Sequence, residues 1–267
     1  MKTKMLKVVC ICLITLASTS CSKNNDCDPE DEDSPCYAGP FGNSKQLLIE
    51  EKTNGKTEMR FEYNDRNLVS VRFVHGVDGN VTREDFTYNG DIPIKVERRS
   101  NGQLVMSEEY LYDNSKKPTS AIQKNNKGEN LSNIRYTYSG NNVTEALFDS
   151  EGKSIGVNTY TFDNTGKNII KQVLNLQNIS LVTIEYSDYD EKPCRYTNYP
   201  WAWKVGSVNN ARSQSLTSQV EGGVVATRND RWKYTYNASG YPVKAEVYDK
   251  KTDALIEIRE FTYRPAK

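Results

Sequence analysis

Histidine and carboxylate side chains are the first places to look for catalysis in this 267-residue chain, and they form no recognisable site. The one histidine, His75, lies beside Gly76, where a turn or strand end is expected, whereas a catalytic triad needs a histidine bonded to a nucleophile. Asp188 and Asp190 are suitable calcium ligands, but no EF-hand spacing surrounds them. The 35 Asp and Glu residues are too many to single out a glycosidase pair. We therefore expect a protein that is not an enzyme and holds no metal or cofactor, with a surface hydrolase as the weaker alternative.

An aromatic cluster is the better candidate for binding. It comprises Tyr196, Tyr199, Trp201 and Trp203 and lies in a Pro-, Trp- and Asn-containing stretch, residues 191–223. Exposed aromatic rings stack on sugars or anchor peptides, and loops on a rigid scaffold often carry function. The alternative is that the tryptophans fill the protein interior, because large aromatic side chains are mostly buried.

The elements that position these residues follow from a repeat. Pairs of alternate aromatic residues recur every 24 to 27 residues, with one interval of 50 that we interpret as two periods. Such periods indicate arrays of one supersecondary unit. The aromatic pairs are Phe61/Tyr63, Phe86/Tyr88, Tyr110/Tyr112, Tyr136/Tyr138, Tyr160/Phe162, Tyr234/Tyr236 and Phe261/Tyr263, and Ile184/Tyr186 continues the series with one aliphatic member.

Each unit has the pattern of a β-hairpin. Residues 81–88 alternate strictly, with Phe86 and Tyr88 on one face and Arg83 and Asp85 on the other. Turn signals such as Asn54-Gly55 separate the alternating runs. The sequence predicts an all-β antiparallel meander of about 14–16 strands, curled into a soluble barrel or left as an open curved sheet. The aromatic face is expected to be buried and dry, with the charged groups in water and residues 191–223 inserted as a plug or cap.

The predicted outer face argues against a bilayer span, because a membrane barrel needs a continuous apolar band facing lipid. Charged residues instead occupy the face opposite the tyrosines, at Arg83, Asp85, Glu109, Arg135, Glu185, Lys233 and Glu260.

The N-terminus has the layout of an export signal. Basic residues precede an apolar run of ten residues, 8–17, which is too short to span a bilayer and leads through small residues to Cys21. We expect residues 1–20 to be a lipoprotein signal peptide, Cys21 to carry the lipid, and residues 21–44 to include an acidic, flexible tether. The β domain then occupies residues 45–267. Ser18 stands where the lipobox pattern has Leu, so the exact cleavage position is left open.

Cysteine use fits an oxidising compartment. Cys27, Cys36 and Cys194 remain after export and lipidation, so at most one internal disulfide can form. We favour Cys27 with Cys36, and Cys36 with Cys194 is the alternative. Lys+Arg and Asp+Glu both count 35, so no basic patch directs the chain to nucleic acid.

Several segments resemble the tyrosine-aspartate (YD) repeats of Rhs-type proteins: Tyr112-Asp113-Asn114, Phe162-Asp163-Asn164-Thr165-Gly166, Tyr63-Asn64-Asp65 and Tyr236-Asn237-Ala238-Ser239-Gly240. With the leader, the whole is similar to a Bacteroidota lipoprotein family of unknown function with a porin-like β fold. The resemblance spans residues 45–264 and implies architecture, not activity. The acidic residues after Cys21 resemble the export signal of Bacteroidota-type surface lipoproteins, which implies display on the outer membrane.

Together these features favour a non-enzymatic lipoprotein that binds or scaffolds a glycan, peptide or envelope partner through an aromatic-lined β surface. A purely structural envelope component is the alternative. The membrane would be a partner only through the lipid on Cys21.

Overall fold

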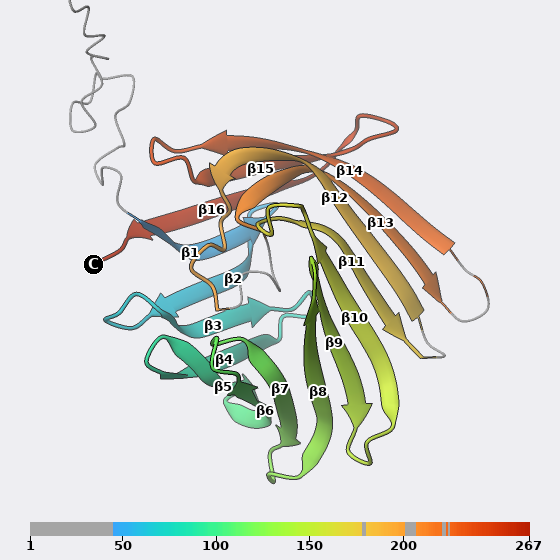
Figure 1. The fold of residues 1–267 in the computed structure, drawn as a ribbon. Helices are drawn as coiled ribbons and strands as arrows, with labels where there is room; N and C mark the ends of the chain where they lie inside the picture. Colours follow the sequence, from blue (N-terminus) through green and yellow to red (C-terminus); the bar gives the residue numbers. More distant parts are fainter. Residues whose placement is uncertain (1–44, 178–179, 201–206, 221–222, 224) are drawn as a thin grey trace, which may run out of the picture.

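Sixteen antiparallel strands form one closed barrel in which every strand pairs with its neighbours in sequence (Figure 1). The computed structural model describes residues 45–177, 180–200, 207–220, 223 and 225–267. The strands are β1 Gln46–Thr53, β2 Lys56–Tyr63, β3 Val69–His75, β4 Val81–Asn89, β5 Ile92–Ser100, β6 Gln103–Tyr112, β7 Pro118–Asn125, β8 Asn130–Ser139, β9 Asn142–Asp149, β10 Ser154–Phe162, β11 Ile169–Leu176, β12 Ser180–Pro193, β13 Asn209–Val220, β14 Val225–Tyr236, β15 Pro242–Asp249 and β16 Leu255–Pro265. The predicted meander is confirmed.

The barrel closes where the first strand meets the last. β1 pairs with β16 from Gln46 opposite Pro265 to Thr53 opposite Arg259. Of the two predicted forms, the closed barrel is therefore confirmed and the open sheet is not. Closure leaves no unpaired strand edge, which is the feature that makes open sheets prone to aggregate. Among the described residues, no helix is long and apolar enough to cross a membrane.

The turns follow from local sequence. Asn54 and Gly55 both have positive φ, 50° and 76°, as a two-residue hairpin of type I′ requires. At the ends of β2, β6, β10 and β14, an Asp or Asn after the last aromatic residue of the strand organises the turn instead. The Oδ1 atom of Asp113, for example, accepts the backbone N–H groups of Ser115 and Lys117 at 2.8 and 3.0 Å. In each tyrosine–Asp/Asn pair, the aromatic residue therefore ends the strand and the Asp or Asn forms the turn that follows.

A tyrosine near the end of seven even-numbered strands bonds to the backbone of the strand before it. The Tyr88 hydroxyl donates to the Val69 carbonyl at 2.7 Å, and the Tyr263 hydroxyl donates to the Pro242 carbonyl at 2.8 Å. The accepting residue generally lies at or near the start of the preceding strand. We call these side chains the latch tyrosines: Tyr63, Tyr88, Tyr112, Tyr138, Tyr189, Tyr234 and Tyr263.

Two expectations from the repeat need correction. The interval of 50 residues between Tyr186 and Tyr236 is not two periods, because it spans the same step of two strands, from β12 to β14, as every other interval. Long strands and an excursion from the sheet account for its length. The stretch 191–223 is also not an insertion throughout, since residues 209–220 form β13.

The barrel interior is also not uniformly dry and apolar. Aromatic rings pack toward the end where the even-numbered strands finish, but charged side chains occupy the same inward face further along. Glu84 and Glu108 are buried there, although they share the face of Phe86 and Tyr110. The prediction that all ionic groups face water was wrong, because inward carboxylates are stabilised by inward arginines on neighbouring strands.

Candidate functional site

Residues 194–200, which we call the plug, leave β12 and cross the barrel interior. At one end the Cys194 N–H bonds to the Val208 carbonyl at 2.7 Å, next to the start of β13. At the other, the ring of Tyr199 lies edge-on to Phe61 of β2 and Phe86 of β4, with centroids 6.1 and 5.9 Å apart. Since β12 and β13 lie across the barrel from β2 and β4, the plug spans the lumen near this end.

One buried carboxylate fixes the plug to the wall. The fully buried Glu51 of β1 accepts a hydrogen bond from the Tyr196 hydroxyl and one from Arg259 Nη1 at 3.2 Å. Its Oε2 atom lies 3.4 Å from Arg195 Nε in an ion pair. Burial alone would raise the pKa of Glu51, but Arg195, Tyr196 and Arg259 outweigh it and the pKa is lowered. Glu51 is therefore charged at neutral pH, and its charge pairs with the plug.

The binding residues predicted from sequence are divided by the structure. Tyr196 and Tyr199 come together in the plug, where their ring centroids are 6.3 Å apart and both side chains pack against barrel residues. They are packing residues of the interior and present no exposed platform. Trp201, Trp203, Cys21, Cys27 and Cys36 lie outside the described residues. Cys194 is a buried free thiol whose pKa is raised by burial.

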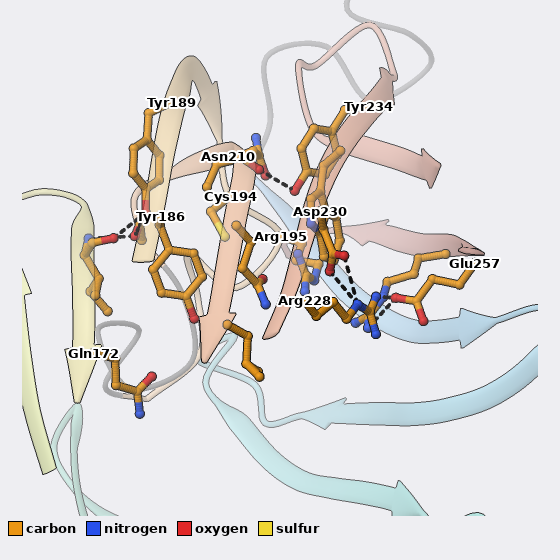
Figure 2. Close-up of a pocket in the computed structure, with 17 residues that line it drawn as sticks. Gln172, Tyr186, Tyr189, Cys194, Arg195, Asn210, Arg228, Asp230, Tyr234 and Glu257 are labelled. Atoms are coloured by element: carbon orange, nitrogen blue, oxygen red, sulfur yellow. Dashed lines mark hydrogen bonds and ion pairs between the residues drawn. The ribbon is translucent and has the colours of Figure 1, made fainter. Parts of the chain in front are cut away.

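A cavity of about 250 Å³ lies between the plug and the wall formed by β11–β14 and β16 (Figure 2). Tyr186, Asn210 and Gln214 line it from β12 and β13, Trp232 lines it from β14, and Arg195 enters from the plug. Cross-strand pairing places Tyr186 directly opposite Gln214, and Gln214 opposite Asp230. This volume is much larger than the roughly 10–15 Å³ that one water molecule needs. It approaches the lower limit of ligand-pocket volumes, about 300 Å³.

The cavity concentrates polar atoms that lack hydrogen-bond partners. Trp232 Nε1, Asn210 Oδ1 and Arg195 Nε are all buried and without a hydrogen bond among the described residues, although Arg195 keeps its ion pair with Glu51. Buried polar groups are nearly always paired, because leaving one unpaired costs about 1–3 kcal/mol. Asn210 and Trp232, which line the cavity, therefore each carry a buried polar atom that no described residue satisfies, and this favours a polar ligand beside them.

Charges in the cavity are paired within it. Arg228 Nε lies 2.8 Å from Asp230, and Arg259 Nη2 lies 2.8 Å from Glu257. Asp230 is 2% exposed, whereas the Arg228 side chain is 45% exposed, so the cavity reaches solvent on the side of Arg228. A guanidinium has five N–H donors, so each arginine keeps donors after pairing.

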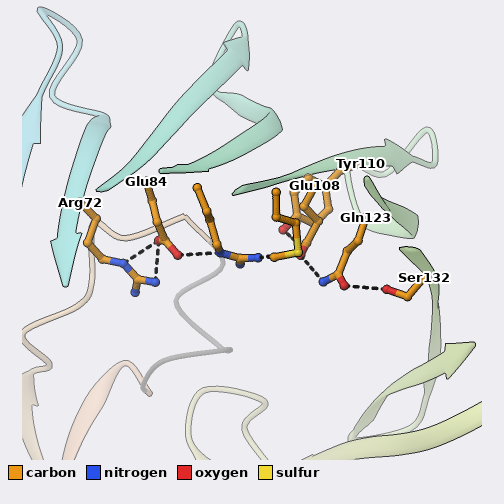
Figure 3. A network of polar contacts seen from close by, with 8 residues as sticks. Arg72, Glu84, Glu108, Tyr110, Gln123 and Ser132 are labelled. Atoms are coloured by element: carbon orange, nitrogen blue, oxygen red, sulfur yellow. Dashed lines mark hydrogen bonds and ion pairs between the residues drawn. The ribbon is translucent and has the colours of Figure 1, made fainter. Parts of the chain in front are cut away.

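A row of polar contacts continues around the opposite wall of the lumen (Figure 3). Arg72 pairs with Glu84 at 2.6 Å, and Glu84 accepts a hydrogen bond from Arg98 Nε at 2.9 Å. Glu108 and Gln123 extend the row through a bond of 2.7 Å toward Ser132. Every carboxylate in this row has partners, so it stabilises the wall and offers fewer free groups than the cavity.

The comparisons with known proteins bear on the fold. A porin-like protein from Bacteroides uniformis ATCC 8492 has a similar solved structure, with a TM-score of 0.51 and 12% sequence identity. The likeness covers 84% of this chain and 99% of that one. The chain has a porin-like β-barrel fold. No protein-family model matches the sequence, and no curated protein is significantly similar to it. The porin-like likeness defines architecture and leaves the ligand to be argued from the cavity.

Of the cavity residues, the aromatic series contained Tyr186 and Tyr234, and sequence reasoning missed most of the others. Trp232 was visible as the aromatic residue two positions before Tyr234, which places both on the inward face. Gln214 and Asn210 gave no such signal, because a polar residue in an alternating strand normally faces water. Their inward position becomes evident only when the register of β12, β13 and β14 is known.

Proposed function

We propose that the protein is an exported, lipid-anchored envelope protein that binds a small polar ligand in the lumen of its barrel and catalyses no reaction. The observation that carries the binding role is the cavity, whose lining residues Asn210 and Trp232 each hold a buried polar atom without a hydrogen bond among the described residues. The plug supports binding over conduction, because Tyr196 and Tyr199 occupy the lumen that a pore would need open. As part of the same proposal, the tyrosine–Asp/Asn pairs support a relationship between this barrel and YD repeats.

The outer wall supports a barrel that stands in water and reaches the membrane only through the lipid on Cys21. Ion pairs lie on the outward face, as in Arg83 with Asp85 at 2.6 Å and Lys171 with Glu185 at 3.0 Å. Charges on a lipid-facing wall cost up to about 2–4 kcal/mol each near the bilayer midplane. The acidic residues that follow Cys21 favour display on the outer face of the outer membrane.

The anchor is tested with Cys21→Ala and with a chain that begins at residue 22. The unmodified protein is expected in the membrane fraction and to be labelled by a fatty acid analogue. Both altered proteins are expected to lose the label, and the truncated chain is expected to be monomeric without detergent. A truncated chain that needs detergent to stay dispersed would show that the wall itself contacts lipid.

The binding role is tested by native mass spectrometry of protein extracted gently from membranes. A bound small molecule is expected, and it should disappear in Leu216→Trp, which fills the cavity from its lining. Lys233→Ala on the outer face is the control and should keep the ligand. Absence of any bound molecule, together with an unchanged melting temperature in the presence of envelope extracts, would favour a purely structural component.

A further inference from the structure

The cavity that the proposed function uses has a chemical character that restricts its ligand. Three guanidinium groups, of Arg195, Arg228 and Arg259, are matched by the carboxylates of Glu51, Asp230 and Glu257. The site is therefore close to neutral as it stands. An anionic or cationic ligand would add an unbalanced charge in a partly buried place, where charges are costly.

The groups left available are a mixture of donors and acceptors. Trp232 Nε1–H is a donor and Asn210 Oδ1 is an acceptor, whereas Arg195 Nε is paired with Glu51. The Tyr186 hydroxyl and the Gln214 amide, each able to donate and accept, face one another across β12 and β13 and have no hydrogen bond among the described residues. A hydroxyl group also donates once and accepts twice, so a polyhydroxylated ligand fits this mixture.

An aromatic face completes the site. Tyr186 lines the cavity and is half-buried, and within the described part of the chain no ring or cation stacks on it. Burial raises the pKa of Tyr186, so its hydroxyl keeps its proton at neutral pH. The ring of Trp232, by contrast, is covered by Arg259, whose guanidinium carbon lies 5.1 Å from the ring centroid. Tyr186 is therefore the surface on which the C–H face of a ring can stack.

We infer that the ligand of the lumenal cavity is a neutral saccharide, held by the Tyr186 ring and by hydrogen bonds with Gln214, Asn210 and Trp232. This inference rests on the proposed function, since it names the ligand class of the same site. The volume of about 250 Å³ suits one or two sugar units and excludes a folded peptide segment.

The test measures binding of defined sugars to the purified full-length lipoprotein in mild detergent. Calorimetry and saturation-transfer NMR would use glucose, galactose, mannose, N-acetylglucosamine and their β- and α-linked dimers. Glucuronic acid, galacturonic acid and trialanine are the charged and peptide probes. At least one neutral sugar is expected to bind, with saturation transfer to its ring C–H protons.

Two neighbouring substitutions on β13 make a matched pair. Gln214→Ala removes an amide that faces the cavity and is expected to weaken sugar binding at least tenfold. Ser215→Ala, on the adjacent outward position, is expected to leave affinity unchanged. Both variants should keep the melting temperature of the parent, because neither side chain packs in the core clusters.

The outcomes separate this inference from the proposed function. Binding of a uronic acid or of trialanine in place of neutral sugars would overturn the saccharide inference and leave lumenal binding standing. Neutral-sugar binding that Gln214→Ala and Ser215→Ala affect equally would also overturn it, since the sugar would then lie elsewhere. If no probe binds and native mass spectra show no small molecule, both the saccharide inference and the proposed binding function are overturned.

Discussion

Each latch tyrosine acts on the backbone as well as on the core. Its ring lies inward, and its hydroxyl donates to a carbonyl near the start of the preceding strand, as Tyr263 does to Pro242 at 2.8 Å. Proline there has no N–H of its own to offer the sheet, so its carbonyl is the group that the strand end can bond. The hydroxyl thus fixes the register of two neighbouring strands at one end of the barrel.

Removing one latch hydroxyl should cost stability without changing the fold. Tyr263→Phe keeps the buried ring and loses the bond to Pro242, so the free energy of unfolding should fall by about 1 kcal/mol. Tyr248→Phe is the comparison, because its hydroxyl bonds to Glu246, whose side chain is partly exposed, and its loss should cost far less. Urea titration monitored by far-UV circular dichroism measures both. Equal losses for the two variants would mean that the latch contributes nothing of its own.

The residue pattern predicted the strands correctly, but it did not predict that charged side chains such as Glu84 would lie inside the barrel. Alternation places Glu84 on the same face as Phe86, and the sequence alone cannot say whether such a glutamate is solvated or buried. The answer depends on Arg72 and Arg98, which stand beside it on β3 and β5 and pair with it at 2.6 and 2.9 Å. Those partners are 12 and 14 residues away, and only the register brings them together.

At the scale of elements, the plug is the part that distinguishes this barrel from a plain meander. Tyr196 reaches Glu51, which lies 145 residues earlier in the chain. The broken repeat predicted that something would occupy the interior, but no local pattern indicates which strand receives it. The barrel must close before β1 faces the plug, so this contact is a property of the closed fold.

Glu51→Gln should destabilise the protein in a pH-dependent way. The pKa of Glu51 is lowered on folding from its usual 4.5, so its ionic contribution is present above that value and is lost as pH falls through the folded pKa. At pH 7 the substitution leaves Arg195 without its partner and should cost about 3 kcal/mol. Below pH 4.5 the difference between the two proteins should shrink.

Denaturant unfolding at pH 7 and at several points below pH 5 measures this difference. Glu62→Gln on the exposed outer face is the control and should show little change at either pH. A loss for Glu51→Gln that is constant across the pH range would show that the charge of Glu51 does not hold the plug.

At the scale of the whole molecule, the closed barrel keeps the same strand pairings wherever in the circle of strands the chain begins. The two ends of the barrel lie together, because the Ala266 N–H bonds to the Lys45 carbonyl at 2.8 Å. A permuted chain that joins residue 267 to residue 45 by a short linker, and begins at Gly152 in the β9–β10 turn, keeps all sixteen pairings. It should fold with the same strand content, since exposed turns tolerate new termini.

Deleting β16 is the opposite change and should cause the protein to aggregate. A chain that ends at residue 254 leaves β1 and β15 as two unpaired edges and removes Arg259 and Phe261 from the interior. Unpaired edges associate with other chains, so aggregation is expected on size-exclusion chromatography, while the permuted chain elutes as a monomer. The truncated protein could instead stay monomeric, with a circular dichroism signal that corresponds to fifteen ordered strands. That result would mean that the other strands do not depend on the pairing of β1 with β16 for their stability.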